Sequence, residues 1–336
     1  MSYYPHRILL IGGAGYVGNV VADYLLRSRY EVTCLDNLLY QHLDSISKFE
    51  KLVNYHFMCG EFQNAEILDQ ALQGVTDVVI LAGLVGDPIT KKYPGLSEEI
   101  NEKGISQLFD QLNGRRLRRV VFISTCSNYG LIDSDELADE DHPLRPLSAY
   151  SKAKVANEQK LLAMEGDADF QATILRFATA FGLSPRMRFD LTVNEFTRDL
   201  ALGKELEVYD ADTWRPYCHV KDFARLIGLV LSAEDRQLEK KVFNAGGDQN
   251  NATKRTIVEA VRNRLPEAKI EFRDNGSDPR NYRVNFQRVR ETLGFVPQYS
   301  IESGIEEVLE AVKGGEFPET AAGQPSYGNY EIANAS

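Results

Sequence analysis

Short apolar runs alternate with stretches of helical spacing through the first half of this chain, and this rhythm limits the folds that it can adopt. Because the runs are apolar throughout, they suit strands buried on both faces, as in a parallel sheet covered by helices. The pattern predicts strands at 7–11, 31–35, 55–58, 77–81, 119–124 and 172–177. It predicts helices at 16–27, 63–72, 97–112 and 150–164.

The rhythm breaks after about residue 176, where the pattern is too irregular for a second doubly wound sheet. Beyond it we expect helices at 220–231, 254–264 and 301–312, a short strand at 242–244, and loops at 185–190, 211–216 and 274–281. We therefore predict an α/β protein, with a Rossmann-type doubly wound parallel sheet and a smaller, irregular C-terminal α/β lobe. The expected parts are 1–176 with a return helix near 219–232, an interleaved lobe at 177–315, and a flexible tail at 316–336.

Composition excludes several classes of protein. The net charge of -11 opposes binding to a nucleic acid, because a polyanion would be repelled. No stretch approaches the roughly 20 apolar residues of a membrane helix, and the polar start is unlike a signal peptide, so we expect a cytoplasmic protein. The four cysteines form no C-x-x-C pair and the five histidines are scattered, so we expect neither a disulfide framework nor a metal site.

A glycine-rich turn joins the first expected strand to the first expected helix. Gly12, Gly15 and Gly18 have the spacing G-x-x-G-x-x-G, and Asp36 ends the next strand. Such a turn lets the backbone approach a pyrophosphate, while the helix that follows directs its free N–H groups at the phosphates. A carboxylate at position 36 accepts hydrogen bonds from a ribose 2'-hydroxyl and repels a 2'-phosphate. The pattern therefore predicts binding of NAD.

A second group of residues carries reactive side chains. Tyr150 and Lys154 are four residues apart, so they share one face of a helix. An ammonium and a positively charged nicotinamide both favour the phenolate, which makes Tyr150 a candidate base. Hydroxyls follow the strand at 119–124, and the carboxyl ends of parallel strands open into the binding crevice. One of these hydroxyls can bond the oxygen that Tyr150 deprotonates.

Together these motifs resemble the extended short-chain dehydrogenase/reductase family, and the resemblance covers roughly residues 7–315. It implies a hydride taken from a sugar carbon, usually C4, of a nucleotide sugar by NAD. The implied catalytic residues are Thr125, Tyr150 and Lys154, and Asn101 matches a helix asparagine that steadies the active site. The implied cofactor contacts are Gly12, Gly15, Tyr16, Val17, Gly18, Asp36, Asn37, Glu61, Phe62, Leu81, Ala82, Gly83, Tyr150 and Lys154.

The second lobe is also similar to the family, and there the resemblance implies a nucleotide-sugar site. Arg215 and Arg280 are expected to reach the diphosphate, because the planar fork of arginine pairs with phosphate oxygens. Thr179 stands where the family often has Asn, which puts that contact in doubt. The implied substrate contacts are Val85, Thr125, Ser127, Asn128, Thr179, Arg186, Arg215 and Arg280.

The resemblance also bears on the reaction. Members that dehydrate carry an acidic group directly after the catalytic Thr, whereas this chain has Cys126 and Ser127 there. This favours a 4-epimerase or a 4-dehydrogenase, with a 4,6-dehydratase or 4-keto reductase as the alternative and a non-catalytic NAD-binding relative as a further one. The stretches 85–88 and 184–190 are most similar to GDP-heptose 4-dehydrogenases. The family commonly forms homodimers through a four-helix bundle, here through 97–112 and 150–164.

Overall fold

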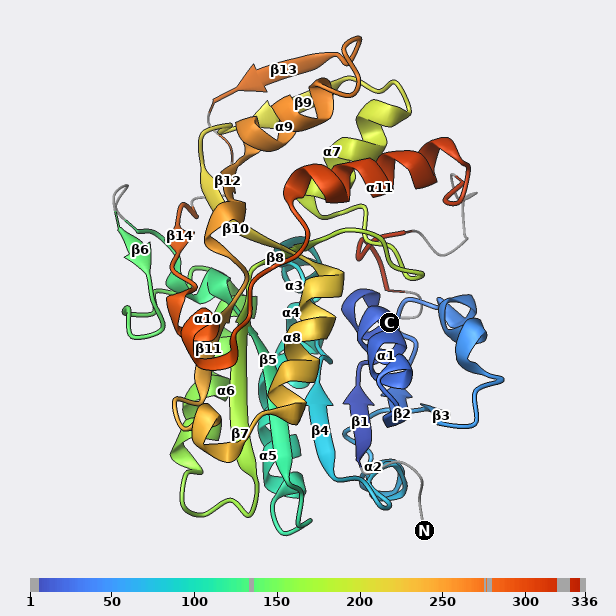
Figure 1. Cartoon of the computed structure of the whole chain (residues 1–336), viewed down its shortest axis with the longest axis vertical. Helices are drawn as coiled ribbons and strands as arrows, with labels where there is room; N and C mark the ends of the chain where they lie inside the picture. The colour runs from blue at the N-terminus through green and yellow to red at the C-terminus, as the bar shows by residue number, and fades with distance from the viewer. Residues whose placement is uncertain (1–5, 133–135, 275, 277–279, 319–326, 333–336) are drawn as a thin grey trace.

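A seven-stranded parallel sheet forms the centre of the lower part of the molecule in Figure 1. The computed structural model describes residues 6–132, 136–274, 276, 280–318 and 327–332. The strand order β11-β7-β5-β4-β1-β2-β3 is that of a doubly wound fold, which confirms the predicted fold class. The strands are β1 (Arg7–Ile11), β2 (Glu31–Asp36), β3 (Tyr55–Cys59), β4 (Asp77–Ile80), β5 (Arg119–Thr125), β7 (Gln171–Phe177) and β11 (Val242–Ala245).

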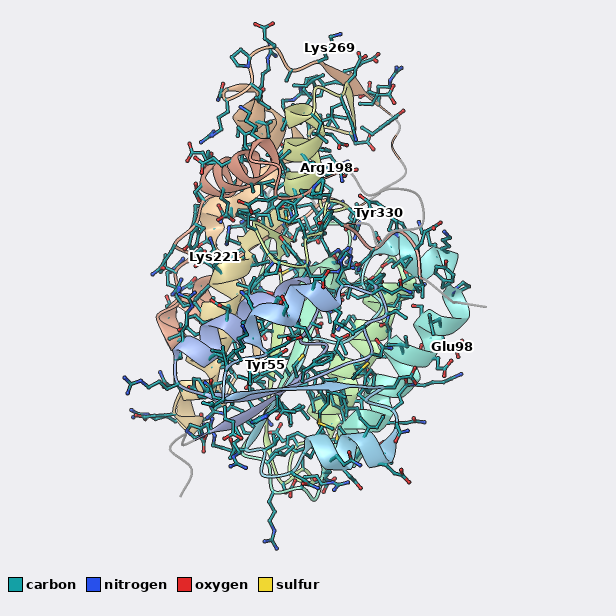
Figure 2. The ribbon with its side chains drawn as sticks, turned by 90° about the vertical axis from the view of Figure 1, so that its right-hand side faces the viewer. Tyr55, Glu98, Arg198, Lys221, Lys269 and Tyr330 are labelled. Atoms are coloured by element: carbon teal, nitrogen blue, oxygen red, sulfur yellow. The ribbon has the colours of Figure 1, made fainter. Side chains whose placement is uncertain are left out.

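A smaller lobe lies beyond the carboxyl ends of these strands, at the top of Figure 1. In the turned view of Figure 2, Arg198 and Lys269 mark this lobe and Tyr55 marks the sheet. Its strands form small sheets, namely β8 (Thr179–Phe181), β10 (Trp214–His219) and β12 (Asn251–Thr253), then β9 (Leu206–Tyr209) with β13 (Ile270–Arg273), and β6 (Leu137–Ala138) with β14 (Arg283–Val284). Its helices are α7 (Thr192–Ala201), α9 (Lys254–Arg262) and α11 (Ile301–Lys313), whereas α10 (Gln287–Leu293) lies beside β11 at the edge of the large sheet.

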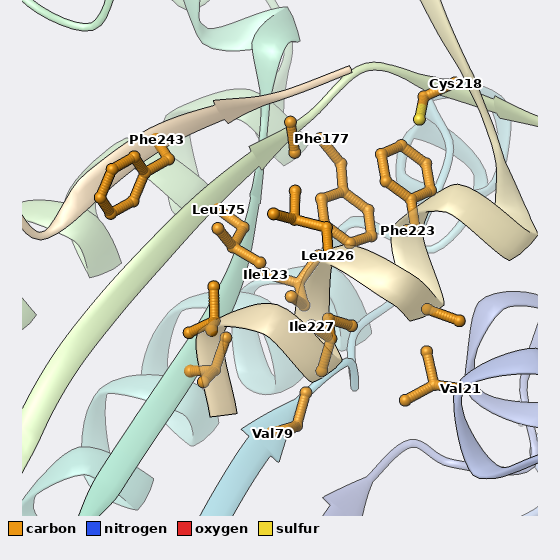
Figure 3. Packing of buried hydrophobic residues seen from close by; sticks show 14 of the residues in the cluster. Val21, Val79, Ile123, Leu175, Phe177, Cys218, Phe223, Leu226, Ile227 and Phe243 are labelled. Carbon is orange, nitrogen blue, oxygen red and sulfur yellow. The ribbon is translucent and has the colours of Figure 1, made fainter. Parts of the chain in front are cut away.

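Helices cover both faces of the large sheet because side chains alternate along each strand. On one face lie α1 (Tyr16–Arg27) and α8 (Val220–Ser232), and on the other lie α2 (Ala65–Ala71), α5 (Ile105–Leu112) and α6 (Ala149–Ala163). Figure 3 shows α8 packed on the strands, where the rings of Phe177 and Phe223 stack with centroids 3.7 Å apart.

The expected helix at 97–112 has a less regular form. The structure has α3 (Asp87–Lys92), then α4 (Pro94–Ser97), a π-helical stretch at Glu98–Gly104, and then α5. The wider turn of a π-helix displaces the chain from ordinary helical spacing, which hydrophobic periodicity does not reveal.

The two parts are interleaved in the chain. β11 comes from the range expected to form the second lobe, yet it pairs with β7 at the edge of the large sheet. Within the expected flexible tail, the described residues 327–332 lie against the body of the protein, with the Phe189 N–H donating to the Tyr327 carbonyl at 2.8 Å. None of the described helices is long and apolar enough to cross a membrane.

At two positions in the first turn, neighbouring backbone atoms lie so close that only glycine fits. Gly12 has a φ of +82°, and a Cβ there would lie 2.6 Å from the backbone nitrogen of Ala82. A Cβ on Gly18 would lie 2.5 Å from the carbonyl oxygen of Gly13. Both obstacles are backbone atoms, so a side chain at either position would push α1 away from the sheet.

We predict that Gly18→Ala lowers the free energy of unfolding by about 1–3 kcal/mol, the usual cost of overpacking. Urea denaturation followed by circular dichroism measures the change. Gly95→Ala is the matched control, because Gly95 lies in a helix and a Cβ there meets nothing within 4 Å. Equal stability of the Gly18 variant and the wild type would contradict the packing argument.

Candidate active site

A cleft of about 500 Å³ lies between the carboxyl ends of the large sheet and the second lobe. This is the position at which open α/β sheets bind their ligands. The structure brings almost all the residues predicted for the cofactor, the substrate and catalysis to this cleft. Those that line it are Gly12, Gly15, Tyr16, Val17, Gly18, Asp36, Asn37, Glu61, Phe62, Leu81, Ala82, Gly83, Val85, Thr125, Ser127, Tyr150, Lys154, Thr179, Arg186, Arg215 and Arg280.

One half of the cleft is built around the glycine turn. The Asp36 carboxylate accepts hydrogen bonds from the backbone N–H groups of Ala14 at 3.0 Å and Leu38 at 2.8 Å. Burial raises the pKa of Asp36, and these two N–H donors oppose the shift. A Cβ on Gly15 would meet only the Gly12 oxygen, at 3.4 Å, so the start of α1 is open to the cleft. An open helix N-terminus beside a fixed carboxylate fits the diphosphate and ribose of NAD.

Asn101 holds the loop that follows β4. Its side-chain oxygen accepts from the Leu84 N–H at 2.7 Å, and its side-chain nitrogen donates to the Leu84 carbonyl at 2.9 Å. Its own carbonyl accepts from Asn157 of α6 at 2.6 Å. The cleft wall at Gly83 and Val85 is therefore tied to the helix that carries Tyr150.

The reactive side chains meet where β5 ends and α6 begins. Lys154 donates to the carbonyl of Ile123 at 2.7 Å, and its nitrogen lies 5.8 Å from the centre of the Tyr150 ring. The Thr125 oxygen accepts from the Ser127 N–H at 3.1 Å, which leaves the Thr125 hydroxyl hydrogen able to donate into the cleft.

Burial is the largest influence on the pKa values of Tyr150 and Lys154. It raises the pKa of Tyr150, and Arg188 is the main charge that opposes the shift. Burial also lowers the pKa of Lys154 to about 7, and Glu158 partly opposes that shift. Activation of Tyr150 by Lys154 and by the nicotinamide stays a prediction, and Arg188, to which the sequence analysis assigned no catalytic role, is a further cation that lowers the pKa of Tyr150.

Asn128 lies behind the cleft and does not line it. It is fully buried, and its side-chain nitrogen donates to Ser124 at 3.2 Å and to Glu158 at 2.8 Å. Glu158 is also paired with Arg176, 2.7 Å away. This network uses the side-chain nitrogen of Asn128, whereas its side-chain oxygen has no hydrogen-bond partner among the described residues, so the substrate contact predicted for Asn128 stays a prediction.

The other half of the cleft is rich in arginine. Arg280 pairs with Asp87 at 3.1 Å, and the Arg215 guanidinium lies 5.2 Å from the centre of the Tyr282 ring. The Tyr282 hydroxyl lies 3.2 Å from the Ser127 hydroxyl, next to the catalytic cluster. Asp278 and Pro279, which precede Arg280 in the sequence, lie outside the described residues.

Several lining residues escaped the sequence analysis. These are Tyr40, Arg188, Asp190, Lys254, Tyr282 and Asn329. Lys254 begins α9, and the others lie in loops or in the C-terminal segment, where the sequence has no periodic pattern that indicates a cleft. Arg188 and Asp190 lie in the predicted loop 185–190, which also holds Arg186. Among the described residues, no group of three or more His, Cys, Asp or Glu side chains is placed to hold a metal ion.

The sequence and the structure were compared with known protein families, curated proteins and solved structures. Residues 8–246 match the model of the NAD dependent epimerase/dehydratase family. The chain is 26% identical to a dTDP-glucose 4,6-dehydratase of Streptomyces niveus, over 90% of this chain and 92% of that protein. It is 26% identical to a UDP-glucose 4-epimerase of Halalkalibacterium halodurans, over 89% and 93%. A dTDP-glucose 4,6-dehydratase of Bacillus anthracis, solved with NAD, superposes with a TM-score of 0.80 at 25% identity, over 93% and 97%.

The lowered pKa of Lys154 predicts how stability changes with pH. Between pH 7 and the ordinary lysine pKa of 10.5, the unfolded chain binds a proton that the folded protein does not. The free energy of unfolding therefore rises with pH in this window, by up to about 1.4 kcal/mol per pH unit from this group. Below pH 7 both states are protonated and the contribution is constant.

The measurement is urea unfolding of cofactor-free protein at pH 7, 8 and 9, for the wild type and for Lys154→Met. We expect the wild type to gain stability relative to the variant as pH rises. Parallel curves for the two proteins would show that Lys154 titrates at its ordinary pKa.

Proposed function

Because the chain belongs to the NAD dependent epimerase/dehydratase family, we propose that it is an enzyme that oxidises C4 of a nucleotide-activated sugar. The hydride goes to NAD, and the reaction ends as a 4-epimerisation or as a 4-dehydrogenation. The observation that carries this proposal is the position of Thr125, Tyr150 and Lys154, which lie at the junction of the two halves of the cleft.

Each residue of the cluster has a distinct task. Tyr150 accepts the proton of the C4 hydroxyl as the C4–H bond breaks and its electron pair leaves as hydride. Bound NAD supplies the acceptor for that hydride. Thr125 donates a hydrogen bond to the C4 oxygen, and Lys154, held by the Ile123 carbonyl, favours the phenolate of Tyr150 when it is charged. Return of hydride to the other face of the keto sugar gives the epimer, and release of the ketone gives the dehydrogenase product.

Two arginines on the other side of the cleft are suited to bind the diphosphate of a nucleotide sugar. Arg215 is buried yet lines the cleft, and Arg280 lies 3.5 Å from the Ser127 hydroxyl. Two guanidinium groups near the catalytic hydroxyls suit the two phosphates that join a nucleoside to its sugar. The likeness of 85–88 and 184–190 to GDP-heptose 4-dehydrogenases makes GDP-heptose the first sugar nucleotide to test.

Elimination of water is less favoured, although one relative is a dehydratase. A dehydratase needs a further acid or base near the catalytic Thr. Cys126 is fully buried and donates to the Arg176 carbonyl at 3.1 Å, and burial raises the pKa of its thiol. Asp87 and Asp190, carboxylates on the substrate side, are paired with Arg280 and Arg188. A non-catalytic role is also disfavoured, since the chain keeps both Tyr150 and Lys154.

We also propose that the protein acts as a homodimer through a four-helix bundle. The helical region 94–112 and α6 pack side by side, joined by the bond from Asn157 to the Asn101 carbonyl. These adjacent helices run in the same direction, as Asn157 meets Asn101 and Lys160 meets Asp110, and they can pair with the same helices of a second copy across a two-fold axis.

The proposed function is tested by offering NAD with UDP-, GDP-, CDP- and dTDP-sugars. Absorbance of reduced nicotinamide is followed, and the products are identified by NMR. Reduced cofactor that accumulates with one sugar nucleotide would identify a dehydrogenase and its base. A new diastereomer without net reduction would identify an epimerase. A 4-keto-6-deoxy product would instead identify a dehydratase, and no reaction with any sugar would contradict the proposal.

We predict that Tyr150→Phe reduces kcat by at least about a hundredfold, the usual contribution of a general base, while NAD still binds. Turnover and bound NAD are measured on the same preparation. Tyr209→Phe is the control, because Tyr209 is exposed on β9, in the second lobe. Full activity of the Tyr150 variant would remove this residue from the mechanism.

A further inference from the structure

We propose that Arg186 and the C-terminal segment 327–332 form a second wall of the cofactor site, which keeps NAD in the cleft through turnover. The inference rests on the proposed function and adds to it, because retained NAD returns its hydride to the same sugar. It assigns to the cofactor an arginine that the sequence analysis assigned to the substrate.

The segment bridges the second lobe and the large sheet. On the lobe side, the Tyr327 carbonyl accepts from the N–H of Phe189. On the sheet side, the Tyr327 ring stacks on His42, with centroids 5.9 Å apart. His42 follows Asp36 and the loop that lines the cofactor half of the cleft. Figure 2 shows Tyr330 at the level between the two parts of the molecule.

Further contacts fasten the segment to the loop after β4. The Asn329 side chain donates to the Val85 carbonyl at 2.9 Å, and Glu331 pairs with Lys92 at 2.8 Å. Ile332 is buried in a small apolar cluster with Leu84. The segment is thus attached on both sides of the cleft, and a ligand held beneath it leaves only if these contacts open.

Arg186 lies at the cofactor end of the cleft. Its guanidinium is 4.6 Å from the centre of the Tyr40 ring, and the Asp36 carboxylate is among the charges that act on it. A nitrogen of Arg186 donates to the Gly328 carbonyl at 3.4 Å, so the segment holds the side chain in place. Arg215 instead lies beside Tyr282, at the substrate end.

Arg186 differs from its neighbour Arg188 in having no acidic partner. Arg188 donates to Asp190 through two of its nitrogens, at 3.0 and 2.5 Å. Of the described residues, no carboxylate lies within salt-bridge distance of Arg186, although its side chain is only 3% exposed. A buried guanidinium without a carboxylate suits an anionic ligand. Beside Asp36, the residue suited to the ribose, that anion is the diphosphate of NAD.

Asn329 provides a second unused polar group. Its side chain is 7% exposed and lines the cleft, and its oxygen has no hydrogen-bond partner among the described residues. Since the Asn329 nitrogen already donates to Val85, the oxygen is left as an acceptor for a ribose hydroxyl. One segment therefore orients a cation and an acceptor toward the cofactor.

The experiment measures exchange of bound NAD for isotopically labelled NAD in the full-length protein. Arg186→Gln removes the cation, and Ile332→Asp places a charge in the apolar cluster and releases the segment. We expect both to accelerate exchange by about tenfold or more, the effect of losing a charge-assisted hydrogen bond. Ile332→Val is the matched control and is expected to exchange at the rate of the wild type. Amide hydrogen exchange verifies that the segment 327–332 is released in the Ile332→Asp variant. If it is not released, NAD exchange is measured instead on a protein that ends at residue 326.

Two results would overturn the inference. One is unchanged NAD exchange in a protein whose segment is released. The other is an Arg186→Gln variant with normal NAD exchange and a raised KM for the nucleotide sugar, which would return Arg186 to the substrate site. Both leave the proposed function intact, whereas a wild-type protein that binds no NAD would contradict that function itself.

Discussion

The close approach of backbone to backbone at the first glycine turn controls the rest of the structure. Because Gly12 and Gly18 allow α1 to start directly against β4 and the turn, the helix N-terminus faces the cleft. The same placement carries Tyr16 across to the second lobe, where its hydroxyl donates to the Gly182 carbonyl at 2.6 Å and accepts from Asn194 at 3.0 Å. The glycine turn therefore also helps to set the position of the second lobe.

The catalytic pair shows how burial and charge oppose each other. The phenol of Tyr150 and the ammonium of Lys154 both resist ionisation in their desolvated positions. Burial thus raises the pKa of the phenol and lowers that of the ammonium, and a positive charge close to Tyr150 would favour its phenolate. Within the protein, Arg188 supplies such a charge and partly opposes the effect of burial on Tyr150.

The sequence predicted the parts in which local pattern and tertiary packing agree. The bounds of β1 and α1 match the prediction to the residue, because an apolar run, a glycine turn and a helical stretch meet there. The small sheets of the second lobe were missed, since strands such as β8 and β12 are three residues long and gain their stability from distant partners. Resemblance to the family predicted most of the residues that line the cleft, whereas Asn128, predicted with them, is not among the lining residues. The resemblance did not predict Asn329, because the position of this residue depends on the path by which the C-terminal segment comes back to the cleft.

The path of the chain has a consequence for how the protein is made. The edge of β7 is covered by β11, and the apolar residues Leu175 and Phe177 are covered in part by α8, both of which follow much of the second lobe in sequence. During synthesis, this edge and face stay open until residue 245 has left the ribosome, and exposed strand edges of this kind pair readily with other chains. A fragment ending at residue 176 would keep the same defect permanently. The second lobe is formed by residues between β7 and α8 and by residues that follow β11, so no single cut in the chain separates it from the large sheet.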